Sequence, residues 1–166
     1  QVETQLKYVI ILLANIKKTP RIMTTNLQYK VLETVEEMLQ SLHLVNQVYP
    51  EITLQNLESS VKEMIEENDY KMLAAFDAGE LVVVCGYWTL RMLYCGRYLQ
   101  ISNLIVDESR RSQGIGAKVL DHLEEYAKEL KCNKVVLDSH FNNKRSHELF
   151  ARQGFYIRGL HFMKDL

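Results

Sequence analysis

The residues best suited to chemistry lie in one polar stretch, where Val106 is followed by DESRRSQGIGA, residues 107–117. An apolar run precedes this stretch and a long helical pattern follows it, so we expect a strand to lead through a glycine-containing turn into a helix. The first N–H groups of such a helix have no partner in their own helix, and the helix dipole adds partial positive charge there. Glycines let a bulky anion approach the backbone, while Arg110, Arg111 and Lys118 add full charges. Together these features predict a phosphate or pyrophosphate cradle.

Two known phosphate-binding motifs can be compared with this turn. The Walker A motif is excluded because G-x-x-x-x-G-K-[ST] does not occur. The Rossmann dinucleotide fingerprint fits in part: Gly114 and Gly116 match its first two glycines, and Asp138 ends the next expected strand at about the expected ~20-residue distance. Two observations disagree with this fingerprint. Val119 occupies the position of its third glycine, and the strand–turn–helix unit begins so far along the chain that too few residues remain for a second nucleotide-binding half. A bare helix start after a flexible turn is the non-functional alternative.

Hydrophobic periodicity predicts the elements that position this turn. Strands are expected at residues 27–31, 72–76, 81–88, 99–106, 135–137 and 155–163, and helices at 35–48, 54–65, 115–130 and 144–152. The short loop around Gly79 joins the second and third strands as a hairpin. The strand–helix–strand unit that ends at Leu137 predicts a parallel crossover. The fold class is therefore α/β, in the form of an α+β mixed sheet with one βαβ crossover.

Length and composition limit the class of protein. The chain has 166 residues, is 47% hydrophobic and 25% charged, and carries a net charge of −1. These values predict a globular domain and exclude a disordered chain or a coiled-coil rod. No positive field is present to attract nucleic acid. The apolar run Tyr8–Ala14 is far shorter than the ~20 residues of a membrane span and has no signal-peptide cleavage site, so no membrane partner is expected.

The start of the chain is expected to lie outside the compact domain. We predict an N-terminal extension over residues 1–22, with a packing helix and a linker at Thr19–Arg21, and a compact domain over residues 23–166. The apolar side of Tyr8–Ala14 needs a cover, which a homodimer would supply.

Cysteine usage indicates a reducing compartment. The three cysteines, Cys85, Cys95 and Cys132, form no C-x-x-C pair, and no nearby histidine completes a zinc set. We therefore predict a cytoplasmic protein with no metal site. Cys85 lies in an apolar run and is expected to be a small buried side chain rather than a nucleophile.

Acidic residues dominate one part of the chain. Residues 33–69 contain nine acidic side chains and one basic side chain, Lys62. Two interpretations stay open: a solvated outer face of two helices, or an acidic rim that attracts a cationic substrate.

Three segments together resemble one family. The sequence RSQGIGA at 111–117 is similar to the R/Q-x-x-G-x-G/A acyl-CoA loop of the GNAT superfamily of N-acetyltransferases. LIVD at 104–107 resembles that family's preceding strand end, and NKRSHELFARQGF at 143–155 resembles the helix that closes its CoA site. The resemblance covers about residues 27–166. It implies a GNAT-like fold with helices on both faces of a mixed central sheet, and acetyl-CoA (coenzyme A) as the acyl donor.

The resemblance also implies roles for individual residues. The backbone amides from Gln113 to Ala117 would hold the pyrophosphate, and main-chain groups of Leu104 and Val106 would pair with the pantetheine arm. Asn143 would bond the pantetheine, while Ser146 and Phe150 would line the thiol end. The full set of implied cofactor-binding residues is Leu104, Ile105, Val106, Arg111, Ser112, Gln113, Gly114, Ile115, Gly116, Ala117, Asn143, Ser146 and Phe150. A primary amine, small molecule or peptide, would then attack the acetyl group directly in a ternary complex.

Two positions depart from the family pattern. Phe150 stands where many members have a tyrosine acid, and Ser102-Asn103 stands where many have a carboxylate base. Asn103 is a candidate for positioning a water, and His147 can titrate near neutral pH or be a partly exposed helix residue. Tyr156 is a candidate acid or, alternatively, a strand aromatic in the core. The departures leave open a catalytically weak acyl-CoA-binding or regulatory module.

Overall fold

The computed structural model describes residues 26–166, so the predicted extension, its linker and the apolar run Tyr8–Ala14 lie outside the described residues. The described chain divides into two compact units at the boundary between Leu137 and Asp138. Each unit is described by itself.

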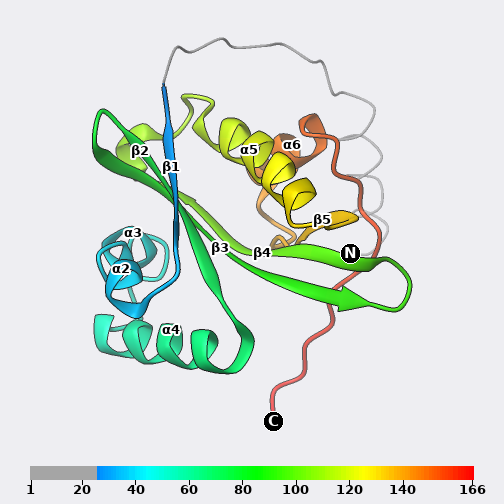
Figure 1. Cartoon of the computed structure of the whole chain (residues 1–166), viewed down its shortest axis with the longest axis horizontal. Helices are drawn as coiled ribbons and strands as arrows, with labels where there is room; N and C mark the ends of the chain where they lie inside the picture. Colours follow the sequence, from blue (N-terminus) through cyan, green and yellow to red (C-terminus); the bar gives the residue numbers. More distant parts are fainter. Residues whose placement is uncertain (1–25) are drawn as a thin grey trace. The chain divides into compact units, whose positions relative to one another are not determined.

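The first unit is built on a five-stranded sheet with the order β1-β2-β3-β4-β5 (Figure 1). Its strands are β1 (Gln28–Leu32), β2 (Lys71–Asp77), β3 (Glu80–Met92), β4 (Gly96–Val106) and β5 (Lys134–Leu137). The first four strands are antiparallel neighbours, whereas β4 and β5 run parallel. The predicted mixed sheet and its single parallel crossover are therefore confirmed.

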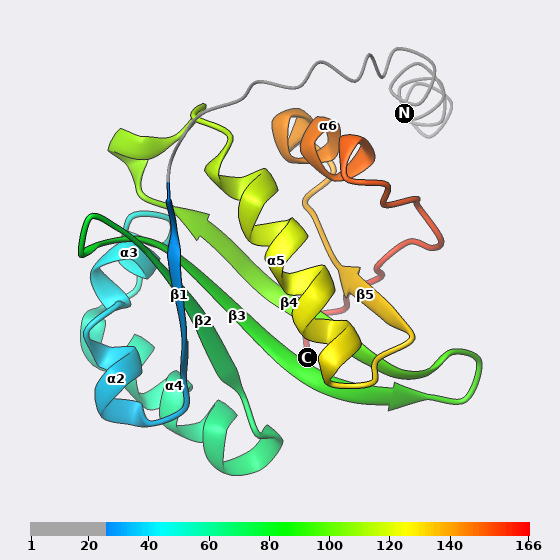
Figure 2. The same ribbon diagram turned by 45° about the horizontal axis from the view of Figure 1, so that its top comes forward.

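Helices cover both faces of this sheet, as expected (Figures 1 and 2). One face carries α2 (Val35–Leu39), α3 (Leu42–Asn46) and α4 (Leu54–Asn68), and the other carries α5 (Ile115–Glu129). The core on the α2–α4 side includes the fully buried Met38, Leu44 and Ala74. On the α5 side, Val119 and Leu123 are fully buried, and the Tyr87 hydroxyl donates to Tyr126 Oη at 3.2 Å.

The prediction of one helix over residues 35–48 is wrong, because the chain breaks between α2 and α3 at Ser41. The Ser41 hydroxyl donates to the Met38 carbonyl at 2.7 Å and lies 3.6 Å from Met72 Sδ, and the residue is 1% exposed. A serine hydroxyl that bonds a nearby carbonyl competes with the helical hydrogen-bond pattern. The break therefore comes from a buried local bond that hydrophobic spacing does not reveal.

The second unit contains α6 (Lys144–Arg152), whose bounds agree with the prediction. The strand predicted over residues 155–163 is wrong: residues 155–166 have no regular structure, and Leu160, Phe162 and Met163 are largely exposed. A strand exists only when a neighbour takes its N–H and C=O groups. The apolar residues of 155–163 suggested a strand, but no neighbouring strand pairs with this segment among the described residues.

Several expected features can be checked against the described residues. Cys85 is fully buried, and that burial raises the pKa of its thiol, so its predicted role as a small buried side chain is confirmed. Within residues 26–166, no group of three or more His, Cys, Asp or Glu side chains is placed to hold a metal ion. No helix in that range is long and apolar enough to cross a membrane.

Candidate functional site

The central feature of the site is an open edge on β4. Strand β5 pairs only with the first part of β4, from Tyr98 to Ile101, so Ser102–Val106 has no neighbouring strand on that side among residues 26–137 (Figure 2). A β-bulge marks the change: Tyr87 of β3 faces Ile101 and Gly86 faces Asn103, which leaves Ser102 as the extra residue. Bulges bend a strand and end its regular pairing.

Backbone direction decides which residues face the open edge. The Asp107 N–H donates to the Val82 carbonyl of β3 at 2.9 Å. Alternate residues of an antiparallel strand direct their main-chain groups to opposite sides, so Leu104 and Val106 face away from β3. Ile105 faces β3, and its side chain is 4% exposed within the core. The open edge thus carries the main-chain groups of Leu104 and Val106 but not those of Ile105.

The strand leads into a short, tightly bonded turn. A 3₁₀ turn, η1 (Glu108–Arg110), follows β4 directly. Asp107 Oδ1 accepts from the Ser109 backbone N–H at 2.9 Å and from the Ser109 hydroxyl at 2.5 Å. Bonds from Ser109 and from Gln47 hold the pKa of the Asp107 carboxyl below its usual value. The charged form of Asp107 is therefore the one that organises this turn.

The start of α5 has the shape of an anion cradle. Gly114 is the N-cap with φ 80°, in the left-handed region, and a Cβ built there would meet no atom within 4 Å. Ser112 also has a positive φ, 66°. The buried Ile115 anchors the first turn in the core. The helix thus begins at a glycine whose Cβ position is open, and Ile115 and Gly116 are first-turn residues whose N–H groups have no carbonyl in their own helix.

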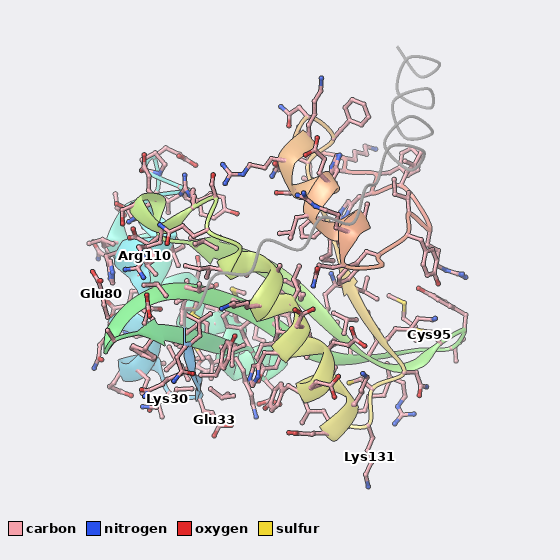
Figure 3. The ribbon with its side chains drawn as sticks, turned by 90° about the horizontal axis from the view of Figure 1, so that it is seen from above. Lys30, Glu33, Glu80, Cys95, Arg110 and Lys131 are labelled. Atoms are coloured by element: carbon pink, nitrogen blue, oxygen red, sulfur yellow. The ribbon has the colours of Figure 1, made fainter. Side chains whose placement is uncertain are left out.

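The two arginines of the loop have different surroundings. Arg110 forms ion pairs with Asp77 and, at 3.7 Å, with Glu80, and Figure 3 shows Arg110 and Glu80 at the same end of the sheet. Arg111 is exposed, and its Nε donates to the Val106 carbonyl at 3.2 Å. The charge of Arg110 is therefore neutralised by the β2–β3 hairpin, while no ion pair of Arg111 occurs among the described residues. Of the two, Arg111 is the cation available to an anionic ligand.

Residues of the second unit are organised around the start of α6. Asn143 is its N-cap, and its side-chain oxygen accepts from the Ser146 N–H at 3.3 Å. The Phe150 ring lies 5.9 Å from the Phe155 ring, and the Phe155 N–H donates to the Phe150 carbonyl at 3.0 Å. These contacts show that Asn143 and Phe150 also have structural roles within this unit.

The two second-unit candidates for proton transfer differ in exposure. His147 is half-buried on α6. Tyr156 lies after α6, outside any strand, and is 64% exposed. The alternative that Tyr156 is a strand aromatic in the core is therefore wrong.

The sheet topology decides between the two phosphate-binding alternatives. A Rossmann-type dinucleotide site needs a parallel sheet of successive βαβ units. Here β1 to β4 are antiparallel and only β4 and β5 are parallel, so the dinucleotide alternative is contradicted. The model of the Acetyltransferase (GNAT) family matches residues 33–155, which include the β4 edge and the cradle. This chain belongs to the GNAT family.

Individual GNAT relatives agree with this assignment. The uncharacterized N-acetyltransferase YhdJ of Bacillus subtilis is 22% identical over 138 residues, which is 82% of this chain and 97% of that protein. Two solved structures share the fold. The ribosomal-protein-alanine N-acetyltransferase of Brucella melitensis has a TM-score of 0.69 at 17% identity and covers 84% of this chain and 99% of that one. The aminoglycoside antibiotic 6′-N-acetyltransferase of Acinetobacter baumannii has a TM-score of 0.68 at 16% identity and covers 85% and 99%.

Three residues that contact the candidate site were not found by sequence reasoning. Gln47 bonds Asp107, Asp77 pairs with Arg110, and the Tyr70 hydroxyl donates to Asn103 Oδ1 at 3.1 Å. These pairs are separated by 60, 33 and 33 residues, respectively. No local spacing signal links residues at such separations, so only the folded sheet brings them together.

Proposed function

We propose that this protein is an acetyl-CoA-dependent N-acetyltransferase that moves an acetyl group to a primary amine by direct attack in a ternary complex. The observation that carries the proposal is the continuous path from the open edge of β4 to the N-terminus of α5. Pairing with β5 stops at Ile101, and the main-chain groups of Leu104 and Val106 that face away from β3 lead toward the Gly114 cap, with the Val106 carbonyl bonded by Arg111 Nε. In a member of the GNAT family, this path supports acyl-CoA binding.

The residues present fit acetyl-CoA, whose role when bound is to supply an acetyl group as a reactive thioester. A Cβ at position 114 would meet no atom within 4 Å, so the glycine leaves open space at the N-cap of α5, where a pyrophosphate can approach the backbone. Arg111 adds a cation beside it, with Ser112, Gln113, Gly116 and Ala117 completing the loop. Leu104 and Val106 offer strand-like hydrogen bonds to the amides of a pantetheine arm. We propose Asn143, Ser146 and Phe150 as its further contacts.

Acetyl transfer from a thioester depends less on an acid that protonates the leaving thiolate than on a base that deprotonates the attacking ammonium. Once the ammonium has lost one proton, the amine nitrogen bonds the acetyl carbon as the carbon–sulfur bond breaks. The sulfur leaves as a thiolate, and the nitrogen loses a second proton, to the thiolate or to solvent, as the amide forms. A thiol pKa near ~8.5 makes the thiolate a tolerable leaving group, so Phe150 slows the reaction without forbidding it. An alkylammonium with a pKa near ~10.4 must first lose a proton. Asn103 through a water, and His147, are proposed for that step, with Tyr156 as the proposed acid.

The proposed acceptor is a cationic amine. On α2, α4 and the segments beside them, Glu36, Glu63, Glu66 and Glu67 are exposed and form no ion pair among the described residues. Exposed carboxylates of one sign raise the local concentration of a cation, and the effect weakens with salt. The named relatives act on an aminoglycoside and on a ribosomal protein, so they support amine acetylation without selecting one amine.

A thermal-shift titration of the full chain with acetyl-CoA, CoA, NAD and NADP tests the donor. A ligand at ~100 times its Kd stabilises the folded state by about 2.7 kcal/mol, which raises the Tm by several degrees. We expect a rise with acetyl-CoA and CoA alone, and release of the CoA thiol when a panel of primary amines is added. A rise without thiol release from any amine would support the acyl-CoA-binding module instead. No rise with acetyl-CoA or CoA would contradict both.

A further inference from the structure

Tyr70 occupies a fixed position beside Asn103, which lies on the open edge of β4. It follows the C-cap of α4, where Asp69 has φ 52°, and its own N–H donates to the Met64 carbonyl at 3.3 Å. The Tyr70 side chain is 2% exposed, and burial raises the pKa of its phenol. The hydroxyl is therefore a neutral donor, and it reaches Asn103 Oδ1 at 3.1 Å.

The sheet leaves room for this contact at one point. Gly86 of β3 lies directly opposite Asn103 in the register. A Cβ on Gly86 would lie 1.7 Å from the Tyr70 hydroxyl oxygen and 2.6 Å from Asn103 Oδ1. Any other residue at position 86 would therefore displace the Tyr70–Asn103 pair, so the pair is built into the sheet beside the bulge.

Trp88 supports Tyr70 from the side. The two ring centroids are 5.1 Å apart and the rings are tilted by 53°. The indole Nε1 of Trp88 is buried and has no hydrogen-bond partner among the described residues. A buried donor without a partner is costly, and it commonly marks a place for a water or a ligand oxygen. The cluster of Tyr70, Trp88 and Asn103 therefore contains at least one donor, the Trp88 indole N–H, that no protein acceptor reaches among the described residues.

The Asn103 side chain has N–H groups without a described protein partner. The Tyr70 hydroxyl proton is used on Asn103 Oδ1, which leaves the two N–H groups of Asn103 Nδ2. No partner for Nδ2 occurs among the described residues, and Asn103 is half-buried at the start of the unpaired part of β4. The free N–H groups of Asn103 can therefore bind an acceptor, such as a water or a hydroxyl or carbonyl oxygen of a substrate.

We propose that Tyr70 is a positioning residue that fixes the Asn103 amide as a donor to an oxygen close to the amino group of the acceptor. The inference rests on the proposed acetyl transfer and narrows its substrate class. An amine with a neighbouring hydroxyl or carbonyl oxygen satisfies Asn103 Nδ2, whereas a plain alkylamine or polyamine offers only donors. Asn103 touches the substrate, and Tyr70 acts through Asn103.

The test compares two kinds of amine on the full chain. Glucosamine and glycinamide carry the oxygen, while propylamine and putrescine lack it. With kcat/KM expressed per concentration of free amine, so that differences in amine pKa do not contribute, we expect the wild-type protein to have the higher value with the oxygen-bearing amines. Tyr70→Phe keeps the ring but frees the Asn103 amide. It should lower kcat/KM for those amines about three- to tenfold, the usual value of one hydrogen bond, with a clearly smaller loss for propylamine, which has no oxygen for the amide to bind. Asn103→Asp accepts from Tyr70 but lacks the N–H donors, and should remove the preference.

A matched control separates this role from general stability. Tyr87→Phe also removes one hydroxyl of a buried tyrosine, whose partner is Tyr126 on the α5 face of the sheet. We expect Tyr87→Phe to leave the substrate preference unchanged. An equal loss on both kinds of amine in Tyr70→Phe, or the same change in both variants, would show that Tyr70 is merely structural and would overturn the proposal.

A second measurement keeps the inference separate from the proposed activity. Trp88 is the single tryptophan of the chain and packs against Tyr70, so its emission reports on the cluster without turnover. With CoA present, glucosamine should change the emission at lower concentration than propylamine, and Tyr70→Phe should reduce that difference. If no amine is acetylated but this difference holds, the proposed reaction fails while the recognition role stands. Equal response to both amines would overturn the role itself.

Discussion

The side chain of Gln47 joins α3 to the turn that starts at Asp107. Gln47 Nε2 donates to Asp107 Oδ2 at 3.0 Å, and Gln47 Oε1 accepts from the Glu108 N–H at 3.1 Å. Gln47 is also the C-cap of α3. One amide therefore connects the helices on one face of the sheet to the loop that precedes the cradle.

Replacing Gln47 should loosen the cradle more than it destabilises the protein. In Gln47→Met both hydrogen bonds are lost, and we expect about 1 kcal/mol of lost stability, since each exposed bond contributes little. The Kd for CoA should rise about three- to tenfold, because the turn is no longer held for binding. Denaturant unfolding and calorimetric titration measure the two effects. Gln40→Met is the matched control, since Gln40 is the exposed C-cap of α2; an equal loss of CoA affinity there would contradict the role of Gln47.

Adding a side chain at Gly114 should abolish CoA binding while the protein stays folded. An L-residue in the left-handed region costs about 1–2 kcal/mol, which lowers the Tm by a few degrees for a chain of this size. The new Cβ of Gly114→Val meets no atom within 4 Å, so the side chain enters space that the wild-type protein leaves open beside the N-cap. Gly79→Val carries similar backbone strain at φ 85°, in the β2–β3 turn, and should retain binding. Retained binding in Gly114→Val would contradict the cradle.

The two loop arginines should respond differently to substitution. Arg110→Met breaks the ion pairs with Asp77 and Glu80 and leaves the Asp77 carboxylate only 19% exposed without its partner, so we expect mainly a lower Tm. Arg111→Met removes an exposed cation, so we expect a weaker Kd for CoA and a smaller salt dependence of binding, with little change in Tm. Titration at two ionic strengths distinguishes them. The reverse pattern would assign the phosphate contact to Arg110.

Stability should fall in mild acid because of His122. Its ring stacks on Tyr29 of β1 with centroids 3.8 Å apart and planes 5° apart. Burial lowers the pKa of His122, although the charge of Glu129 opposes this shift. The unfolded chain therefore binds a proton more readily than the folded chain, so the free energy of unfolding decreases as the pH drops below about 6.5. His122→Phe keeps the stack and should flatten this part of a pH 5–8 unfolding series; an unchanged slope would assign it to other groups.

The turn before α5 and the helices on which the candidate site depends could be predicted from the sequence, because they are set by interactions between residues close together in the chain. The turn from Val106 to Gly114, the helix that follows it and the bounds of α6 depend on residues within a few positions of one another. Capping, glycine geometry and 3.6-residue periodicity act over the same range. The parallel crossover also followed from element order, since a strand, a long helix and a strand have one favoured connection.

Only the tertiary structure decided the rest. Where β5 stops beside β4, and hence which main-chain groups are open, depends on how two strands diverge after the bulge at Ser102. The bonds of Gln47 to Asp107 and of Tyr70 to Asn103 join residues 60 and 33 positions apart, and the α2–α3 break at Ser41 depends on a buried bond. The sequence by itself determined most of the element types and the glycine turn at the start of α5, because those energies are local. Pairing across the sheet positioned the remaining groups, because hydrogen bonds between distant residues form only after the chain has folded.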